Sequence, residues 1–258
     1  MGHQRAAFEL LTQLFTPQTI MQSPTGRMIL AWYTRFDVFI GIMGSFETSL
    51  SREWFATYVE YHSSKTVTEP ENLASKTDAS SARLRHITME MTLLLGKGAR
   101  QEISEGEYAA EHDRISDTLN EWKDGLDPAL QDSSHVVTEF PGAHAMGPDD
   151  IVNPFVPGVL FRPPLFASSI LNCEWHSIFL MHASQAVSEP SDEDRAQLME
   201  HAYAICQICE TVQFWPQSPE GSLVILHSSL AIASLFVPRD SKHHMWIRRK
   251  FALLERMG

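Results

Sequence analysis

The chain has 258 residues, of which 43% are hydrophobic, 20% charged and 10% aromatic. This length suits one large domain or two joined halves, and the hydrophobic fraction excludes a largely disordered chain. With 20 Lys and Arg against 32 Asp and Glu, the formal net charge is −12. Such an acidic surface repels phosphate, so the chain by itself is a poor candidate for binding nucleic acid or an anionic membrane.

Cysteine usage and hydropathy indicate a soluble intracellular protein. Three cysteines are too few for a disulfide framework, which fits a reducing compartment. The longest apolar run, Leu223 to Val237, is 15 residues long, whereas a bilayer span takes about 20. We therefore expect this run to form a buried core helix and expect no membrane partner.

Helical periodicity dominates the first half of the chain, where strand alternation is almost absent. A first helix ends at Pro17, and Ser23 followed by Pro24 predicts the start of the next helix. This second helix carries a broad apolar stripe, as expected of a core-facing surface, formed by Met28, Trp32, Phe36, Phe39, Ile40 and Met43.

Ser51 is the predicted cap of a third helix, whose inner face carries Trp54, Phe55, Tyr58, Val59 and His62. Residues 63–80 are polar and are expected to form an exposed connection. After a further long helical pattern, Ser104 and Glu107 fit a capping box that opens a helix closed by Gly125.

The second half begins with a segment of different composition. Residues 126–164 contain seven of the 14 prolines and show no sustained period. Helices are predicted at about 165–187, at 192–212 with Ser191 as cap, along 222–237 and over a last helix with Trp246 and Leu254. We predict an all-α, compact bundle of about nine or ten helices in one domain over 1–258, whose halves, about 1–125 and 165–258, are joined by a long irregular Pro-rich connection.

No catalytic motif stands out, so the chain is not expected to be an enzyme. There is no Gly-x-Ser-x-Gly elbow, phosphate-binding glycine loop or His-Glu-x-x-His pair. Cys173 with His176, and Cys206 with Cys209, are each spaced to share a helix face, and together they could form a Cys₃His zinc site. The favoured alternative is that the three cysteines are small buried hydrophobes and that the chain holds no metal.

Two charged segments also favour structural roles. His243 and His244, with Lys242, Arg248, Arg249 and Lys250, make the last helix locally basic, which indicates a solvated face over a buried apolar one. Arg35 and Asp37 sit inside an apolar helix and point to different faces. If buried, each needs a partner on a neighbouring helix, so a polar tie that fixes the helix register is favoured over a ligand-binding role.

Seven short sequence blocks resemble the fungal-specific transcription factor domain, which is the regulatory region of fungal binuclear zinc-cluster activators. The blocks follow the family's order and spacing over most of residues 25–258. The similar blocks are Trp32–Val38, Leu50–Trp54, Asn153–Phe155, Arg162–Pro164, Glu174–His176, Ala204–Glu210 and Trp246–Gly258. The resemblance implies an all-α, non-catalytic regulatory domain located in the nucleus. It also marks family-signature positions with a structural role: Trp32, Arg35, Phe36, Asp37, Trp54 and Trp175.

The zinc cluster that contacts DNA in this family is missing, because three cysteines at positions 173, 206 and 209 cannot supply its six. We therefore expect a fragment of a longer factor, which would contact DNA and hold zinc only through a missing N-terminal module. Expected partners are a small-molecule effector and transcriptional co-regulators. The alternatives are a stand-alone helical interaction or metabolite-binding module, and an enzyme without a recognisable motif.

An effector site, if present, is expected where residues 135–164 meet the helices that carry Trp32, Arg35, Trp54 and Trp175. Long ordered loops are often functional, and aromatic side chains with a few polar groups make typical pocket walls. The alternative is that the aromatic residues fill the core and the segment is a linker.

Overall fold

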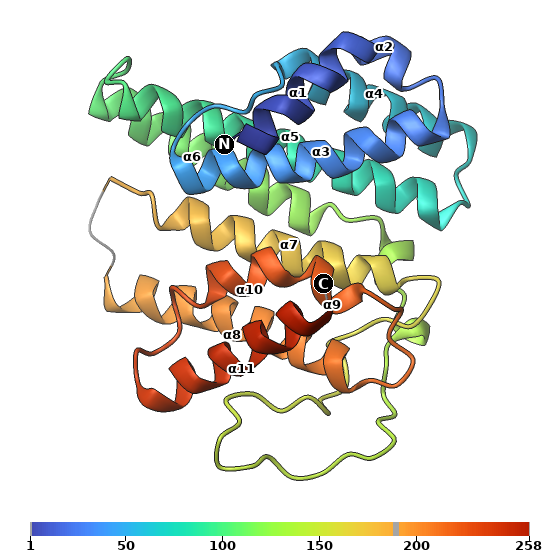
Figure 1. Cartoon of the computed structure of the whole chain (residues 1–258), viewed down its shortest axis with the longest axis vertical. Helices are drawn as coiled ribbons and strands as arrows, with labels where there is room; N and C mark the ends of the chain where they lie inside the picture. The colour runs from blue at the N-terminus through green and yellow to red at the C-terminus, as the bar shows by residue number, and fades with distance from the viewer. Residues whose placement is uncertain (1, 188–190, 258) are drawn as a thin grey trace. The chain divides into compact units, whose positions relative to one another are not determined.

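The computed structural model describes residues 2–187 and 191–257. These residues form eleven α-helices and two short 3₁₀ helices, with no strand beyond an isolated antiparallel bridge between Val136 and Phe161 (Figure 1). The predicted all-α fold class is confirmed.

The chain divides into two compact units, Met1–Asp127 and Pro128–Gly258. The first unit holds α1 (Gly2–Leu14), α2 (Pro17–Ile20), α3 (Pro24–Gly44), α4 (Arg52–Thr68), α5 (Leu73–Ala99) and α6 (Glu105–Asp124). The second holds η1 (Pro128–Gln131), η2 (Ser133–His135), α7 (Phe166–Ala183), α8 (Asp192–Phe214), α9 (Ser222–Ile225), α10 (His227–Ala233) and α11 (Ser241–Met257). The irregular Pro-rich segment is part of the second unit.

Each unit packs its helices around a long central one. In the first unit α5 lies against α3, α4 and α6, and in the second unit α8 lies against α7 and α10. One core cluster of the first unit contains buried residues from each of the helices α1, α2, α3, α4 and α5. Its members are Leu11, Ile20, Met21, Leu30, Tyr33, Val38, Leu50, Trp54, Phe55, Tyr58, Ala82 and Met89.

Of the serines predicted to cap helices, Ser23, Ser104 and Ser191 do so through their side chains, whereas Ser51 precedes α4 without a side-chain capping bond. The Ser23 hydroxyl accepts from the Gly26 backbone N–H at 3.0 Å, and Pro24 occupies the first turn of α3. Ser104 with Glu107 and Ser191 with Asp194 form reciprocal capping boxes at the starts of α6 and α8.

The predicted inner face of α3 is wrong. The side chains that α3 buries include Leu30, Tyr33 and Val38, whereas the predicted stripe turns outward: Trp32 is 72% exposed, and Met28, Phe36 and Met43 are also exposed. Apolar residues occur all round this helix, so periodicity alone did not identify the buried side.

The polar connection predicted at 63–80 is also wrong. Helix α4 continues to Thr68 and α5 begins at Leu73, so the turn between them has four residues, 69–72. Asn72 caps α5, because its side-chain oxygen accepts from the backbone N–H groups of Ala74 and Ser75 at 3.0 and 3.2 Å. The serines and threonines of these helix ends bond back to carbonyls one turn earlier, and these bonds are compatible with a helix.

The apolar run 223–237 was predicted to form one helix, and this prediction is wrong. The run contains two short helices, α9 and α10, which meet at the buried Leu226. The predicted irregular segment before α7 is confirmed (Figure 1). The Val136–Phe161 bridge joins its two ends, and the Val137 N–H donates to the Leu160 carbonyl at 2.8 Å. Among the described residues, no helix has both the length and the apolar composition that a bilayer crossing requires.

Candidate functional site

The residues predicted to line an effector site lie in different environments. In the first unit Trp54 belongs to the apolar core, whereas Trp32 on α3 faces outward and Arg35 is half-buried. In the second unit Trp175 is buried on α7, with its ring centroid 5.3 Å from that of His201 on α8. Trp32 and Trp54 therefore do not form one wall within their unit.

The polar tie predicted for Asp37 is present. Asp37 is fully buried, and its carboxylate accepts from Gln4 Nε2 at 3.0 Å and from the backbone N–H groups of Ser49 and Leu50, both at 2.9 Å. These bonds fasten α1 and the loop after α3 to α3, which is a structural role. Phe36, the neighbouring signature residue, is 44% exposed.

The three thiols are buried, as the core interpretation predicts. Burial raises the pKa of Cys206, and a hydrogen bond with Cys173 together with burial raises the pKa of Cys209, so both are poor nucleophiles. His176 pairs with His201, with their Nδ1 atoms 2.8 Å apart. In the part of the chain that the structure describes, no three His, Cys, Asp or Glu side chains are grouped to hold a metal ion.

A cleft of about 370 Å³ lies in the second unit, between the C-terminal end of α8 and one face of α11. Its volume is within the range of small-molecule sites. On each helix the lining includes residues three or four positions apart, so each helix presents one broad face to the cleft. They are Asp150, Glu210, Gln213, Phe214, Trp246, Arg249, Lys250, Ala252, Leu253 and Arg256.

A buried ion pair forms one wall of this cleft. Lys250 and Glu210 are 7% and 3% exposed, and their ammonium and carboxylate groups are in direct contact. The Lys250 ammonium also donates to Gln213 Oε1 at 2.6 Å. Burial raises the pKa of Glu210, although the positive charge of Lys250 opposes this shift.

Aromatic rings surround the ammonium group. Lys250 Nζ lies 5.0 Å from the ring centroid of Trp246 and 5.6 Å from that of Phe214, within cation–π range. The Trp246 indole nitrogen is buried and has no hydrogen-bond partner among the described residues. The cleft therefore combines a buried charge pair with two aromatic rings.

The irregular segment is attached to the rim of the cleft. Arg249 donates to the Asp149 carbonyl at 2.8 Å, and the neighbouring Asp150 is one of the lining residues. Farther along α8, the ring of Phe214 lies 5.9 Å from that of Phe155 in the same segment. The segment thus contacts α8 and α11, the two helices that form the cleft.

Sequence reasoning missed this cleft and misplaced one of its residues. Lys250 was predicted to lie on a solvated basic face, but it is buried because Glu210, forty positions away, provides its counter-charge. A signal was present: Glu210 is the only charged residue in the otherwise apolar or neutral run from 202 to 212. A lone carboxylate in a buried helix calls for a cationic partner.

The first unit also has a hollow, of about 360 Å³, whose lining includes Ser80, His86 and Trp122. Two of its polar side chains have partners: Trp122 Nε1 donates to the Ser80 carbonyl at 2.9 Å, and His86 lies 3.5 Å from Glu90. This hollow has no buried charge pair in its lining, so the cleft of the second unit is the stronger candidate.

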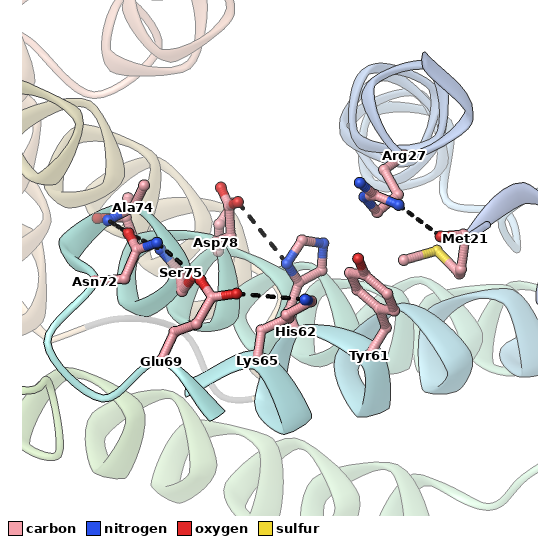
Figure 2. A network of polar contacts seen from close by, with 12 residues as sticks. Met21, Arg27, Tyr61, His62, Lys65, Glu69, Asn72, Ala74, Ser75 and Asp78 are labelled. Carbon is pink, nitrogen blue, oxygen red and sulfur yellow. Dashed lines mark hydrogen bonds and ion pairs between the residues drawn. The ribbon is translucent and has the colours of Figure 1, made fainter. Parts of the chain in front are cut away.

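A second polar cluster of the first unit surrounds His62 (Figure 2). Its ring makes edge contacts with Tyr58 and Tyr61, and its Nδ1 lies 3.8 Å from the Asp78 carboxylate. The guanidinium of Arg27 lies over Tyr61, 5.0 Å from the ring centroid. The cluster adjoins the turn between α4 and α5, and its bonds act within the fold.

We expect the first unit to lose stability in mild acid. Burial, helped by the charges of Arg27 and Arg85, lowers the pKa of His62 to about 4. Between about pH 6.5 and pH 4, His62 binds a proton in the unfolded chain but not in the folded chain. The free energy of unfolding should therefore decrease as the pH falls through this range, by at most about 3 kcal/mol. Urea unfolding followed by circular dichroism at several pH values measures this loss.

The matched control for this titration is His62→Gln, which keeps a polar side chain but cannot titrate. It should remove most of the slope between pH 6.5 and pH 4. Burial raises the pKa of Asp78, which acts in the opposite direction toward the lower end of this range. An unchanged slope in His62→Gln would show that other groups cause the pH dependence.

Comparison with known proteins yields no match: no family model, curated protein or solved structure is similar to this chain. The case for a function therefore rests on the ordered sequence blocks and on the cleft between α8 and α11.

Proposed function

We infer that the chain is a non-catalytic regulatory module of a fungal zinc-cluster transcription factor and that it responds to a small ligand bound between α8 and α11. The observation that carries this proposal is the buried pair of Glu210 and Lys250 in the wall of a small-molecule-sized cleft. A buried ion pair is costly to desolvate and often adds no net stability, so its position beside a cleft favours a binding role.

The lining indicates the chemistry of the ligand. The lining holds three basic side chains, Arg249, Lys250 and Arg256, and two carboxylates, Asp150 and Glu210. Lys250 pairs with Glu210, and Arg249 lies 3.7 Å from the Asp149 carboxylate. The exposed guanidinium groups of Arg249 and Arg256, together with two aromatic rings, suit a small anion with an apolar or aromatic body, such as an aryl carboxylate.

A regulatory role also needs an element that the ligand can bias. The irregular segment fits this requirement, since Arg249 joins it to the cleft and few regular backbone bonds hold it. A ligand that engages Arg249 would change the free energy of this attachment. The segment would then report ligand binding to co-regulators of the full-length factor.

Filling the cleft should abolish ligand binding without unfolding the chain. Ala252 is exposed and lines the cleft, so Ala252→Trp adds bulk where a ligand would lie. In a thermal-shift screen of benzoate, phenylacetate and related aryl carboxylates, a ligand at 100 times its Kd stabilises by about 2.7 kcal/mol, or roughly 5–10 °C. We expect this shift in the wild-type chain and its loss in Ala252→Trp.

The matched control is Ala196→Trp, at an exposed position of α8 outside this lining, which should keep the thermal shift. In the full-length factor, Ala252→Trp should abolish the transcriptional response to the ligand and leave DNA binding intact. Equal shifts in both variants would place the ligand elsewhere. The absence of any Cys-x-x-Cys-x₆-Cys module upstream in the gene would favour a stand-alone binding module.

A further inference from the structure

The outward face of α3 carries a continuous apolar seam, formed by Ile29, Trp32, Phe36, Ile40 and Met43. Ile40 is half-buried, and the other four side chains are between 41% and 72% exposed. No position of the seam is charged. Exposed apolar side chains that form one contiguous stripe commonly mark an interaction surface.

The seam is symmetric about Phe36. Ile29 and Met43 lie seven positions on either side of it, and Trp32 and Ile40 lie four positions on either side. Spacings of three and four keep all five residues on one side of the helix. If two such helices cross antiparallel with Phe36 at the two-fold axis, Ile29 faces Met43 of the other copy and Trp32 faces the smaller Ile40.

We propose that this seam is the interface of a two-fold symmetric dimer in which α3 packs antiparallel against α3 of a second copy of the chain. A closed dimer buries the same patch on both subunits, so the patch must be self-complementary. The arrangement about Phe36 meets this requirement, which an arbitrary apolar patch does not.

The seam supplies part of the area that such a dimer needs. Its five side chains expose on the order of 500 Å², and a stable interface buries about 800 Å² per partner, so flanking residues must contribute the rest. The exposed Met28 lies next to the seam on the same helix and extends it. Because the seam is smaller than a standard interface, we expect a weak dimer whose population depends on protein concentration.

The charge distribution also favours this face. The one acidic residue of α3 is Asp37, which is buried and lies about 100° around the helix from Phe36. Two chains of net charge −12 repel each other, and the seam lets them meet without bringing carboxylates of α3 together. Added salt screens the repulsion and strengthens apolar contact, so association should become tighter from 50 to 500 mM NaCl.

Sedimentation of the chain at 1–100 µM tests the proposal. We expect a concentration-dependent dimer in the wild type and at least about 30-fold weaker association in Trp32→Glu and Phe36→Glu, as is typical of central aromatic residues of an interface. Val67→Glu, at an 81% exposed position of α4, is the matched control and should dimerise like the wild type. Far-UV circular dichroism checks that each variant is folded.

Cross-linking tests the two-fold register. The thiol introduced by Phe36→Cys should form a disulfide-linked dimer under mild oxidation, because only a residue at the axis lies next to its own copy. The thiol introduced by Val67→Cys should not form one. A wild-type chain that stays monomeric at 100 µM would overturn the proposal. A dimer that Trp32→Glu leaves intact would also overturn it. So would a monomeric chain that Trp32→Glu destabilises, because this result would show that the seam packs within its own chain.

Discussion

Lys250→Met should lower the free energy of unfolding of the second unit by about 3–5 kcal/mol. The substitution keeps the length of the side chain but removes the cation that contacts Glu210, which is 3% exposed. An unpaired carboxylate then remains in a site where burial already raises its pKa. Hydrogen exchange of the α11 amides measures the loss in this unit alone.

The matched control for this substitution removes both charges. Glu210→Leu combined with Lys250→Met should recover most of the stability, because a pair of apolar side chains has no desolvation cost. If the double variant is as unstable as the single one, the pair stabilises through its shape and hydrogen bonds rather than through charge compensation.

The stability of the single variant Lys250→Met should depend on pH in a distinctive way. In Lys250→Met the Glu210 carboxyl has lost the positive charge that opposed its raised pKa. A group whose pKa is higher in the folded chain stabilises the fold below its unfolded pKa and loses this contribution as the pH rises. The Lys250→Met chain should therefore regain stability toward acidic pH.

Helix boundaries that depend on neighbouring residues could be predicted from the sequence. Ser23, Ser104 and Ser191 each satisfy backbone donors within three positions, so the capping pattern contains all the necessary information. The serine- and threonine-rich segment 63–80 shows the limit of composition. Its hydroxyl groups can serve a loop or a helix equally, and packing against the rest of the unit selects the helix.

Contacts between distant positions could not be predicted from the sequence. The buried side of α3 includes Asp37, which accepts hydrogen bonds from Gln4, Ser49 and Leu50, and periodicity does not reveal these bonds. The cleft of the second unit depends likewise on Glu210 and Lys250, whose pairing follows from how α8 and α11 pack. In both places the apolar pattern did not identify the contacts of a buried carboxylate, Asp37 in α3 and Glu210 in α8.

Asp37→Ala should destabilise the first unit by about 4 kcal/mol. The fully buried carboxylate accepts three hydrogen bonds, two of them from the backbone N–H groups of Ser49 and Leu50. Without it, both groups lose their partner, and each unsatisfied buried donor costs about 1–3 kcal/mol. Urea unfolding followed by circular dichroism measures the change, with Asp113→Ala at an exposed position of α6 as the matched control.

Asp37→Asn separates the acceptor from the charge. Its amide oxygen can still serve one donor, but its NH₂ group must then face the N–H of Ser49 or of Leu50, so we expect a loss between those of Asp113→Ala and Asp37→Ala. Because the bonds of Asp37 join α3 to α1 and to the loop after α3, we expect a weakened tie to loosen the orientation of α3 and of its seam. Asp37→Asn should therefore weaken the proposed dimer as well, although Asp37 itself lies outside the seam. A dimer that tolerates Asp37→Asn unchanged would show that the packing of α3 on α5 is enough to orient the seam.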